Sequence, residues 1–93
     1  MVSYQTESGM FKINWNKKAV KQLAKVDGQD RNRIATAVTA LADLPNAQNV
    51  KALTNHDYGY RLRVGNYRVL FDADTVIRIV EIQEVKKRDG NTY

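Results

Sequence analysis

The spacing of apolar residues in the N-terminal half changes from a strand pattern to a helical pattern at Trp15. Apolar and polar residues alternate over residues 10–15, which predicts a strand. Asn16 is a residue type favoured at a helix N-cap. Over residues 17–26 the apolar positions Val20, Leu23 and Ala24 form one helical stripe, and Asp27-Gly28 is expected to break this first helix.

A second helix is predicted by the clearest periodicity in the chain. It opens at Gln29 or Asp30, and its apolar positions are Ile34, Ala37, Val38, Leu41 and Leu44. Pro45 is expected to end this helix, because the residue before a proline resists the helical conformation.

The stretch YRLRVGNYRVLF, residues 60–71, predicts two short strands around a Gly65-Asn66 turn. If Val64 pairs with Tyr67, then Arg63 lies opposite Arg68. Side chains alternate between the faces of a strand. One face of the hairpin therefore carries Arg61, Arg63 and Arg68, and the other carries Tyr60, Leu62, Val64, Tyr67, Val69 and Phe71.

Further strands complete the predicted fold. A short strand is expected near residues 50–53, a turn at residues 72–75, and a last strand over residues 76–85 before the basic tail KKRDGNTY. Residues 1–9 are expected to be extended or flexible. Helices followed by a run of strands indicate a single α+β domain over residues 1–93, with two helices packed on one face of a small antiparallel sheet.

The composition of the chain excludes several kinds of functional site and favours one kind of partner. The 93 residues contain no cysteine and one histidine, which excludes disulfides, thiol catalysis and Cys- or His-rich metal sites, so we expect no metal and no cofactor. No run is long and apolar enough to span a bilayer, and the N-terminus lacks the regions of a signal peptide, so a cytoplasmic location is the default. The formal charge of +5 favours an acidic partner such as nucleic acid, an acidic protein or a membrane surface.

The three hairpin arginines are the main candidates for chemistry. A single strand arginine is most simply a solvated residue, but three on one face suggest an anion site, because the guanidinium fork matches phosphate geometry. Neighbouring positive charge would also favour the phenolate form of a tyrosine such as Tyr93. Lysines that could contact nucleic-acid phosphates over a wide footprint are Lys17, Lys18, Lys21, Lys25, Lys86 and Lys87.

Other polar residues are given structural interpretations. His56 is expected to be an ordinary surface-loop histidine, although its ordinary pKa would suit acid–base chemistry. The acidic residues are expected to form turns and solvated strand faces; they are Asp72, Asp74, Glu81 and Glu84. Trp15 and Phe11 are expected to pack in the core.

The element order, the hairpin motif and the trailing KR with a final tyrosine resemble the RelE branch of the RelE/ParE toxin superfamily, over residues 11–93. The resemblance implies a small cytoplasmic bacterial toxin that cuts mRNA in the ribosomal A site. It also implies a cognate antitoxin that neutralises the toxin, contact with operator DNA only through the antitoxin complex, and no membrane partner.

The resemblance also implies catalytic positions, which fall on Arg61, Arg63, Arg68, Arg88 and Tyr93. The chain departs from the best-known relative, which has lysines at the positions of Arg61 and Arg63. Arginine effectively does not give up its proton. If a lysine is the general base in that relative, this chain must use another group, for which Tyr93 is the candidate, or rely more on electrostatic stabilisation. Some relatives also continue past the tyrosine into a terminal helix.

Three functions follow as hypotheses. The first is a metal-independent endoribonuclease that leaves a 2′,3′-cyclic phosphate and a 5′-hydroxyl. The second is a non-enzymatic inhibitor of DNA gyrase resembling ParE, and the third is a plain nucleic-acid-binding module.

Overall fold

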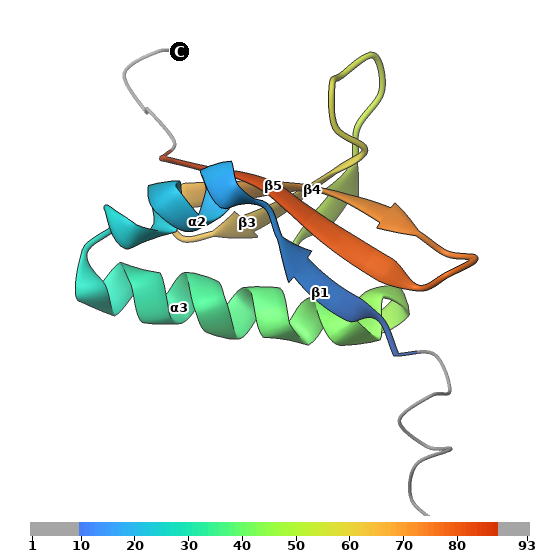
Figure 1. Ribbon diagram of the computed structural model, residues 1–93, viewed down its shortest axis with the longest axis horizontal. Helices are drawn as coiled ribbons and strands as arrows, with labels where there is room; N and C mark the ends of the chain where they lie inside the picture. The colour runs from blue at the N-terminus through green and yellow to red at the C-terminus, as the bar shows by residue number, and fades with distance from the viewer. Residues whose placement is uncertain (1–9, 88–93) are drawn as a thin grey trace, which may run out of the picture.

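The computed structural model describes residues 10–87. Over this range the chain forms two α-helices, one 3-10 helix and a five-stranded sheet (Figure 1). The elements in chain order are β1 (Lys12–Trp15), α2 (Lys17–Ala24), α3 (Gly28–Thr39), η1 (Ala40–Asn46), β2 (Val50–Ala52), β3 (Tyr60–Val64), β4 (Tyr67–Asp74) and β5 (Ile79–Lys87). None of the helices described is long and apolar enough to cross a membrane.

The sheet is mixed, with the strand order β1-β5-β4-β3-β2. Strands β2 to β5 pair antiparallel with their neighbours, as the hairpin patterns predict. Strand β1 pairs with β5 in parallel. The predicted α+β class is therefore confirmed. The prediction of a wholly antiparallel sheet was wrong, because β1 is parallel to its neighbour β5. Alternation of apolar residues fixes which face a strand buries but carries no information on its direction in the sheet.

Helix α3 lies across one face of the sheet and builds the core with it (Figure 1). The predicted stripe supplies Ile34, Val38 and Leu41, all fully or almost fully buried, while Ala37 and Leu44 are partly buried. The sheet contributes the predicted apolar face of the hairpin and three residues of β5, whose alternation is interrupted by a register shift against β4 at Leu70 and Phe71. These sheet residues are Leu62, Val69, Phe71, Val80, Ile82 and Val85. Phe11 and Trp15 pack against this core as expected.

Helix α2 runs beside β5 and begins where the sequence predicts. The Asn16 side chain accepts a hydrogen bond of 2.7 Å from the backbone N–H of Ala19, which confirms the N-cap. The buried positions near this helix are Ala19 and Val26. Of the predicted stripe, Leu23 packs against the core, but Val20 and Ala24 are exposed, so the prediction was wrong at these two residues.

Both ends of the second helix differ from the predictions. Helix α3 begins at Gly28, with Asp27 at the N-cap position. Its regular part ends at Thr39, and a 3-10 segment with a kink at Asp43 continues through Pro45, so the proline does not end the α-helix. The φ and ψ of Asp43 (−108° and 58°) are not helical, so Pro45 lies in a separate turn after this kink, which the N–H of Ala47 closes by donating to the carbonyl of Leu44. A proline is tolerated in the first turn of a helical segment, where its N–H would have no partner.

The last turn lies later than predicted. Strand β4 continues to Asp74, and the chain reverses over residues 75–78. The Asp74 carboxylate accepts hydrogen bonds from the N–H groups of Val76 (2.9 Å) and Ile77 (3.2 Å). Both apolar residues are therefore exposed in the turn, although their β-branched side chains favour strands. A side-chain cap outweighs strand propensity here.

Candidate nucleic-acid interface

The hairpin of β3 and β4 has the register that the sequence predicts. Val64 pairs with Tyr67, Arg63 with Arg68, and Leu62 with Val69. Gly65 in the turn has a φ of 55°, a left-handed conformation that glycine adopts at little cost. The pairing places the three arginines on the side of the sheet away from α3.

We call this side the arginine face, and it carries five cations from four adjacent strands. Two cross-strand rows build its basic end: Lys51, Arg61, Leu70 and Glu84 in one row, and Arg63, Arg68 and Lys86 in the other. Lys51 therefore lies directly opposite Arg61, and Lys86 directly opposite Arg68. Like charges directly opposite each other destabilise a sheet. The fold thus places three like-charged pairs directly opposite each other within one small surface.

The arginines differ in their surroundings. Arg63 is exposed, and Arg61 and Arg68 are partly buried. Within residues 10–87, the Nε atom of Arg61 is buried without a hydrogen-bond partner, and no carboxylate forms an ion pair with Arg61 or Arg63. A buried donor without a partner is unusual in a folded protein and calls for an explanation such as an absent ligand.

A buried glutamate lies beside these cations, which the sequence did not predict. Glu84 is only 8% exposed, and its Oε2 accepts a hydrogen bond of 2.7 Å from the hydroxyl of Tyr58. Its carboxylate also forms ion pairs with Lys18 (3.3 Å) and Lys86 (3.9 Å). The expectation that Glu84 lies on a solvated strand face was wrong, because a loop and a helix far apart in the sequence cover it.

The charges of this cluster fix its protonation at neutral pH. Burial alone raises the pKa of Glu84, but hydrogen bonds from Tyr58 and Lys18 and the charge of Lys86 outweigh burial and hold the pKa below its ordinary value. The pKa of Tyr58 is raised, mainly because its hydroxyl donates to Glu84. The carboxylate is therefore ionised, and the phenol keeps its proton.

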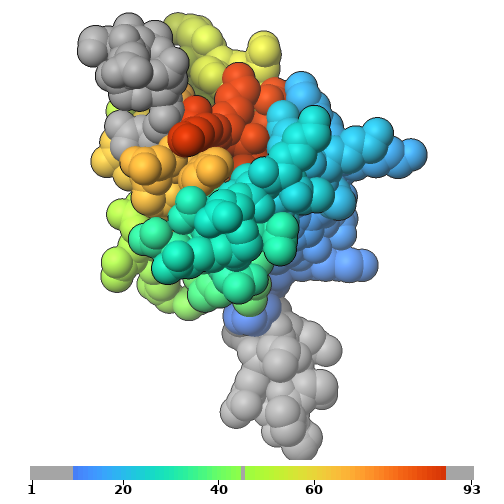
Figure 2. Space-filling model, turned by 90° about the vertical axis from the view of Figure 1, so that its left-hand side faces the viewer, coloured from blue at the N-terminus to red at the C-terminus, as the bar shows by residue number. Residues whose placement is uncertain are grey.

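The candidate lysines fall into distinct groups. Lys18 reaches Glu84 from α2, while Lys17, Lys21 and Lys25 are exposed on or just after the same helix. Figure 2 shows the end of β5 between β4 and α2, and the ion pair of Lys18 with Glu84 joins α2 to the basic end of the sheet.

The two candidate lysines at the end of β5, Lys86 and Lys87, lie on opposite faces of the sheet. Lys86 pairs with Arg68 on the arginine face, and Lys87 pairs with Tyr67, which alternation assigns to the opposite face. Arg88 and Tyr93 lie outside the described residues, so their proposed positions are untested.

Acidic residues occupy the other end of the same face. Asp72 and Asp74 follow Leu70 at alternate positions of β4, and Glu81 pairs with Asp72. They line a hollow of about 590 Å³ with Asn14 and Ile77. Residues 10–87 contain no cluster of three or more His, Cys, Asp or Glu side chains suited to holding a metal.

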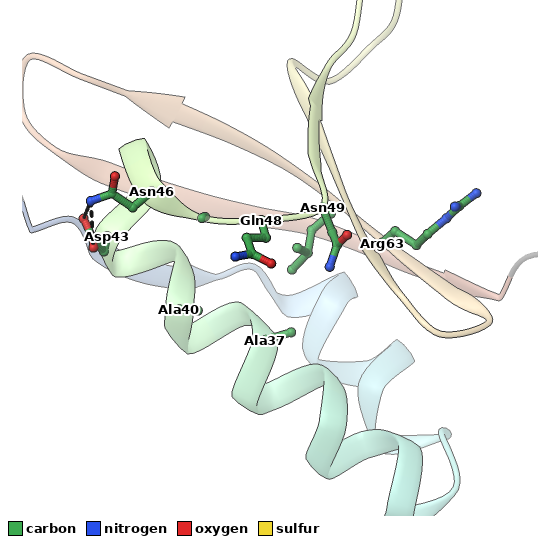
Figure 3. A pocket seen from close by; sticks show the side chains of 9 residues that line it. Ala37, Ala40, Asp43, Asn46, Gln48, Asn49 and Arg63 are labelled. Carbon is green, nitrogen blue, oxygen red and sulfur yellow. Dashed lines mark hydrogen bonds between the residues drawn. The ribbon is translucent and has the colours of Figure 1, made fainter.

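A second hollow, of about 450 Å³, lies between α3 and the β2–β3 edge. Ala37 and Ala40 line it from the helix, and Gln48 and Asn49 line it from the segment before β2 (Figure 3). Figure 3 shows the Arg63 side chain extending away from α3, which agrees with its place on the arginine face.

Solved structures of toxins from toxin–antitoxin systems share this arrangement of helices and strands. The toxin in the Mycobacterium tuberculosis RelBE2 toxin–antitoxin complex superposes with a TM-score of 0.73 at 21% identity, covering 85% of this chain and 99% of that one. The Pyrococcus horikoshii RelE–RelB complex gives 0.74 at 22% identity, covering 87% and 98%. The isolated Escherichia coli RelE toxin gives 0.71 at 15% identity, covering 85% of each chain. The chain thus has the fold of the RelE toxins.

The family follows from the sequence match. Residues 13–88 match the model of the ParE toxin of the type II toxin–antitoxin system parDE, so the protein belongs to this toxin family within the RelE/ParE superfamily. It is the toxin of a type II toxin–antitoxin system. No curated protein matches the sequence.

Proposed function

We propose that the protein is an endoribonuclease that cleaves mRNA in the ribosomal A site and so inhibits translation. The observation that carries this proposal is the arginine face, where three arginines and two lysines from adjacent strands project from one side of the sheet. Such a surface costs stability within the protein, and a polyanion with closely spaced phosphates would relieve that cost.

The proposed reaction is a transesterification within the RNA. The 2′-oxygen attacks the adjacent phosphorus, and the bond from phosphorus to the 5′-oxygen breaks. The proton of the 2′-hydroxyl would pass to Tyr93 or to water, and the departing 5′-oxygen would take a proton from water, so the protons balance. The products are a 2′,3′-cyclic phosphate and a 5′-hydroxyl. The protein contributes mainly by holding the phosphate and stabilising the charge that develops on its oxygens.

The described residues suit this electrostatic role. Arg61 and Arg68 would bind the scissile phosphate, and the buried Nε of Arg61 is a donor already desolvated for that contact. Arg63 would orient the phosphate from the exposed rim. Arg88 would assist the leaving oxygen, and Tyr93 would stack on or polarise the nucleotide, as the family resemblance implies.

The partners of the proposed toxin are the translating ribosome and a cognate antitoxin. The exposed lysines of α2, together with Lys86, would contact ribosomal RNA beside the arginine face. The structurally similar RelE toxins include several solved with a RelB antitoxin. An antitoxin that covers the arginine face, or that displaces Arg88 and Tyr93 from it, would block RNA binding.

The second candidate is inhibition of DNA gyrase, and the specific observation in its favour is the match to the ParE model. That activity would not require a set of phosphate-binding arginines on one face. The retention of three like-charged cross-strand pairs therefore favours the ribonuclease.

Two assays with the purified toxin separate the candidates. We expect mRNA on a translating ribosome to be cut, Arg68→Ala to abolish cutting, and gyrase supercoiling to be unaffected. Loss of supercoiling with intact mRNA would support the gyrase inhibitor. Cutting that Arg68→Ala leaves unchanged would remove the assignment of the arginine face as the catalytic surface.

A further inference from the structure

The loop between β2 and β3, residues 53–59, is attached to the arginine face at two points. The Tyr58 hydroxyl donates to Glu84 of β5, and the N–H of Gly59 donates to the Asp72 carboxylate of β4 at 2.7 Å. The backbone N–H of Leu53 closes the loop by donating to the carbonyl of Gly59 at 2.8 Å. Figure 1 shows this loop rising on the side of the sheet opposite α3.

The two attachment points place Tyr58 within the basic end of the face. Glu84 is the last member of the row that contains Arg61 and Leu70, so the phenol hydroxyl lies about two strand spacings, roughly 10 Å, from the strand of Arg61. Leu70, between them, is only 3% exposed although it lies outside the hydrophobic core. Leu70 is therefore covered by neighbouring side chains, and it forms an apolar centre between Arg61 and Glu84.

The aromatic ring itself is not used by the core. Tyr58 is partly exposed, and its ring contacts that of His56, with 5.9 Å between the centroids and an angle of 47° between the planes. The Nδ1 atom of His56 accepts the N–H of Tyr58 at 3.1 Å, which orients the histidine ring beside the phenol. Two rings thus stand together on a loop that is fixed beside the cations.

We infer that Tyr58 is a nucleobase-stacking residue of the RNA site and that Glu84 is its positioning residue. Aromatic side chains next to a row of cations are the common means of holding single-stranded RNA, with the base on the ring and the phosphate on the cations. The roughly 10 Å between the phenol hydroxyl and the strand of Arg61 is comparable to the reach of one nucleotide from its base to its phosphate. The inference rests on the proposed function for its substrate class, a single-stranded RNA.

The roles of the pair follow from their contacts. Glu84 is almost fully enclosed and already bound to Lys18 and Lys86, so it does not contact RNA in this arrangement. Its effect is to hold the phenol oxygen and so the plane of the ring. It also neutralises part of the positive charge, so the phosphate is directed to the arginines rather than to Lys18.

The test uses two RNA probes that differ by one base. Both are short single-stranded oligoribonucleotides with a 2′-O-methyl group at the central position to prevent cleavage, and one lacks the base at that position. Binding is measured by fluorescence anisotropy at low salt. We expect the wild-type toxin to bind the abasic probe about 10-fold more weakly, from the usual contribution of one base stacked on an aromatic ring.

Variants assign that base-dependent difference to Tyr58. In Tyr58→Ala we expect the two probes to bind equally, at the affinity of the abasic probe. In Tyr58→Phe, which keeps the ring but loses the bond to Glu84, we expect a reduced but measurable difference. Val76→Ala, in the opposite turn, is the matched surface control and should behave as wild type.

Glu84→Gln separates positioning from charge. The amide can still accept the bond from Tyr58, so the base-dependent difference should persist while overall affinity rises because a negative charge is lost.

A base-dependent difference that survives in Tyr58→Ala, or no difference or no binding for the wild-type protein, would overturn the inference. Because the probes are not cleaved, this outcome is independent of the nuclease assay. Stacking without mRNA cleavage would refute the proposed function alone, and cleavage without stacking would refute the inference alone.

Discussion

Replacing Arg61 by methionine should make the protein more stable and less active. The side chain has a buried Nε without a partner among residues 10–87, and it lies directly opposite Lys51. A buried unsatisfied donor costs about 1–3 kcal/mol, and a like-charged cross-strand pair costs about 0.2–1 kcal/mol. Methionine keeps the apolar stem and removes both costs, so Arg61→Met should raise the free energy of unfolding.

The free energy of unfolding should rise by about 1 kcal/mol, because the lost packing of the guanidinium offsets part of the benefit. For a domain of this size, this corresponds to a rise in Tm of about 4–8 °C. Removal of one preorganised charge from a site of developing negative charge typically lowers a rate about 100- to 1,000-fold. Calorimetry and cleavage of ribosome-bound mRNA measure the two effects on one preparation.

Arg33→Met is the matched control. Arg33 is exposed on α3 and pairs with Asp30 at 3.5 Å. Loss of such a surface pair changes stability by about 0–1 kcal/mol, and cleavage should be unchanged. The reasoning fails if Arg61→Met lowers the free energy of unfolding by more than about 1 kcal/mol while cleavage stays at the wild-type rate, because Arg61 would then be a structural residue.

Three further predictions concern stability. Glu84 has a lowered pKa in the folded protein, so its ionised form stabilises the fold above about pH 4, and this contribution is lost as pH falls through the folded pKa. In urea titrations between pH 3 and 6, Glu84→Gln should therefore lose less free energy of unfolding on acidification than the wild type, and an unchanged pH profile would contradict the contacts assigned to Glu84. Asn16→Ala removes the cap on the N–H of Ala19 and should cost about 0.5–2 kcal/mol in urea denaturation, whereas a change near zero would show that the cap contributes nothing. Phe71→Ala empties a fully buried position and should cost about 3–5 kcal/mol by the same measurement, and a cost below about 1 kcal/mol would contradict its place in the core.

Patterns of neighbouring residues in the sequence predicted the elements that depend on contacts within a short segment of the chain. The register of the hairpin follows from a two-residue turn and alternating side chains, and the start of α2 follows from the cap at Asn16. The parallel pairing of β1 with β5 joins residues about 67 positions apart and has no local signal. The later position of the last turn depends on a side-chain cap by Asp74, which competes with the strand propensity of Val76 and Ile77.

The candidate site shows the same division. The shared face of Arg61, Arg63 and Arg68 was predictable because alternation along one hairpin fixes it. Lys51 was missed because its place opposite Arg61 depends on the register of β2. Tyr58 and Glu84 were missed because their contact spans 26 residues and depends on a loop folding over two strands. No sequence signal marked either residue, apart from the proximity of Tyr58 to the hairpin.

The arginine face also has a charge gradient along β4. Alternate residues of this strand run from Arg68 through Leu70 to Asp72 and Asp74. A polyanion is attracted to the first end and repelled from the second, so it would lie across the basic rows near the Gly65 turn. This gradient gives the proposed RNA a preferred position on a sheet that is otherwise symmetric along its strands.

The most direct test of the central claim is a map of the 5′ ends of cellular mRNA after brief induction of the toxin. The account predicts new 5′-hydroxyl ends inside coding regions, in a fixed phase with the reading frame, that disappear in Arg61→Met and persist in Arg33→Met. Growth arrest without new mRNA ends, accompanied by gyrase-linked DNA breaks, would contradict the assignment of the arginine face as an RNA-cleaving surface.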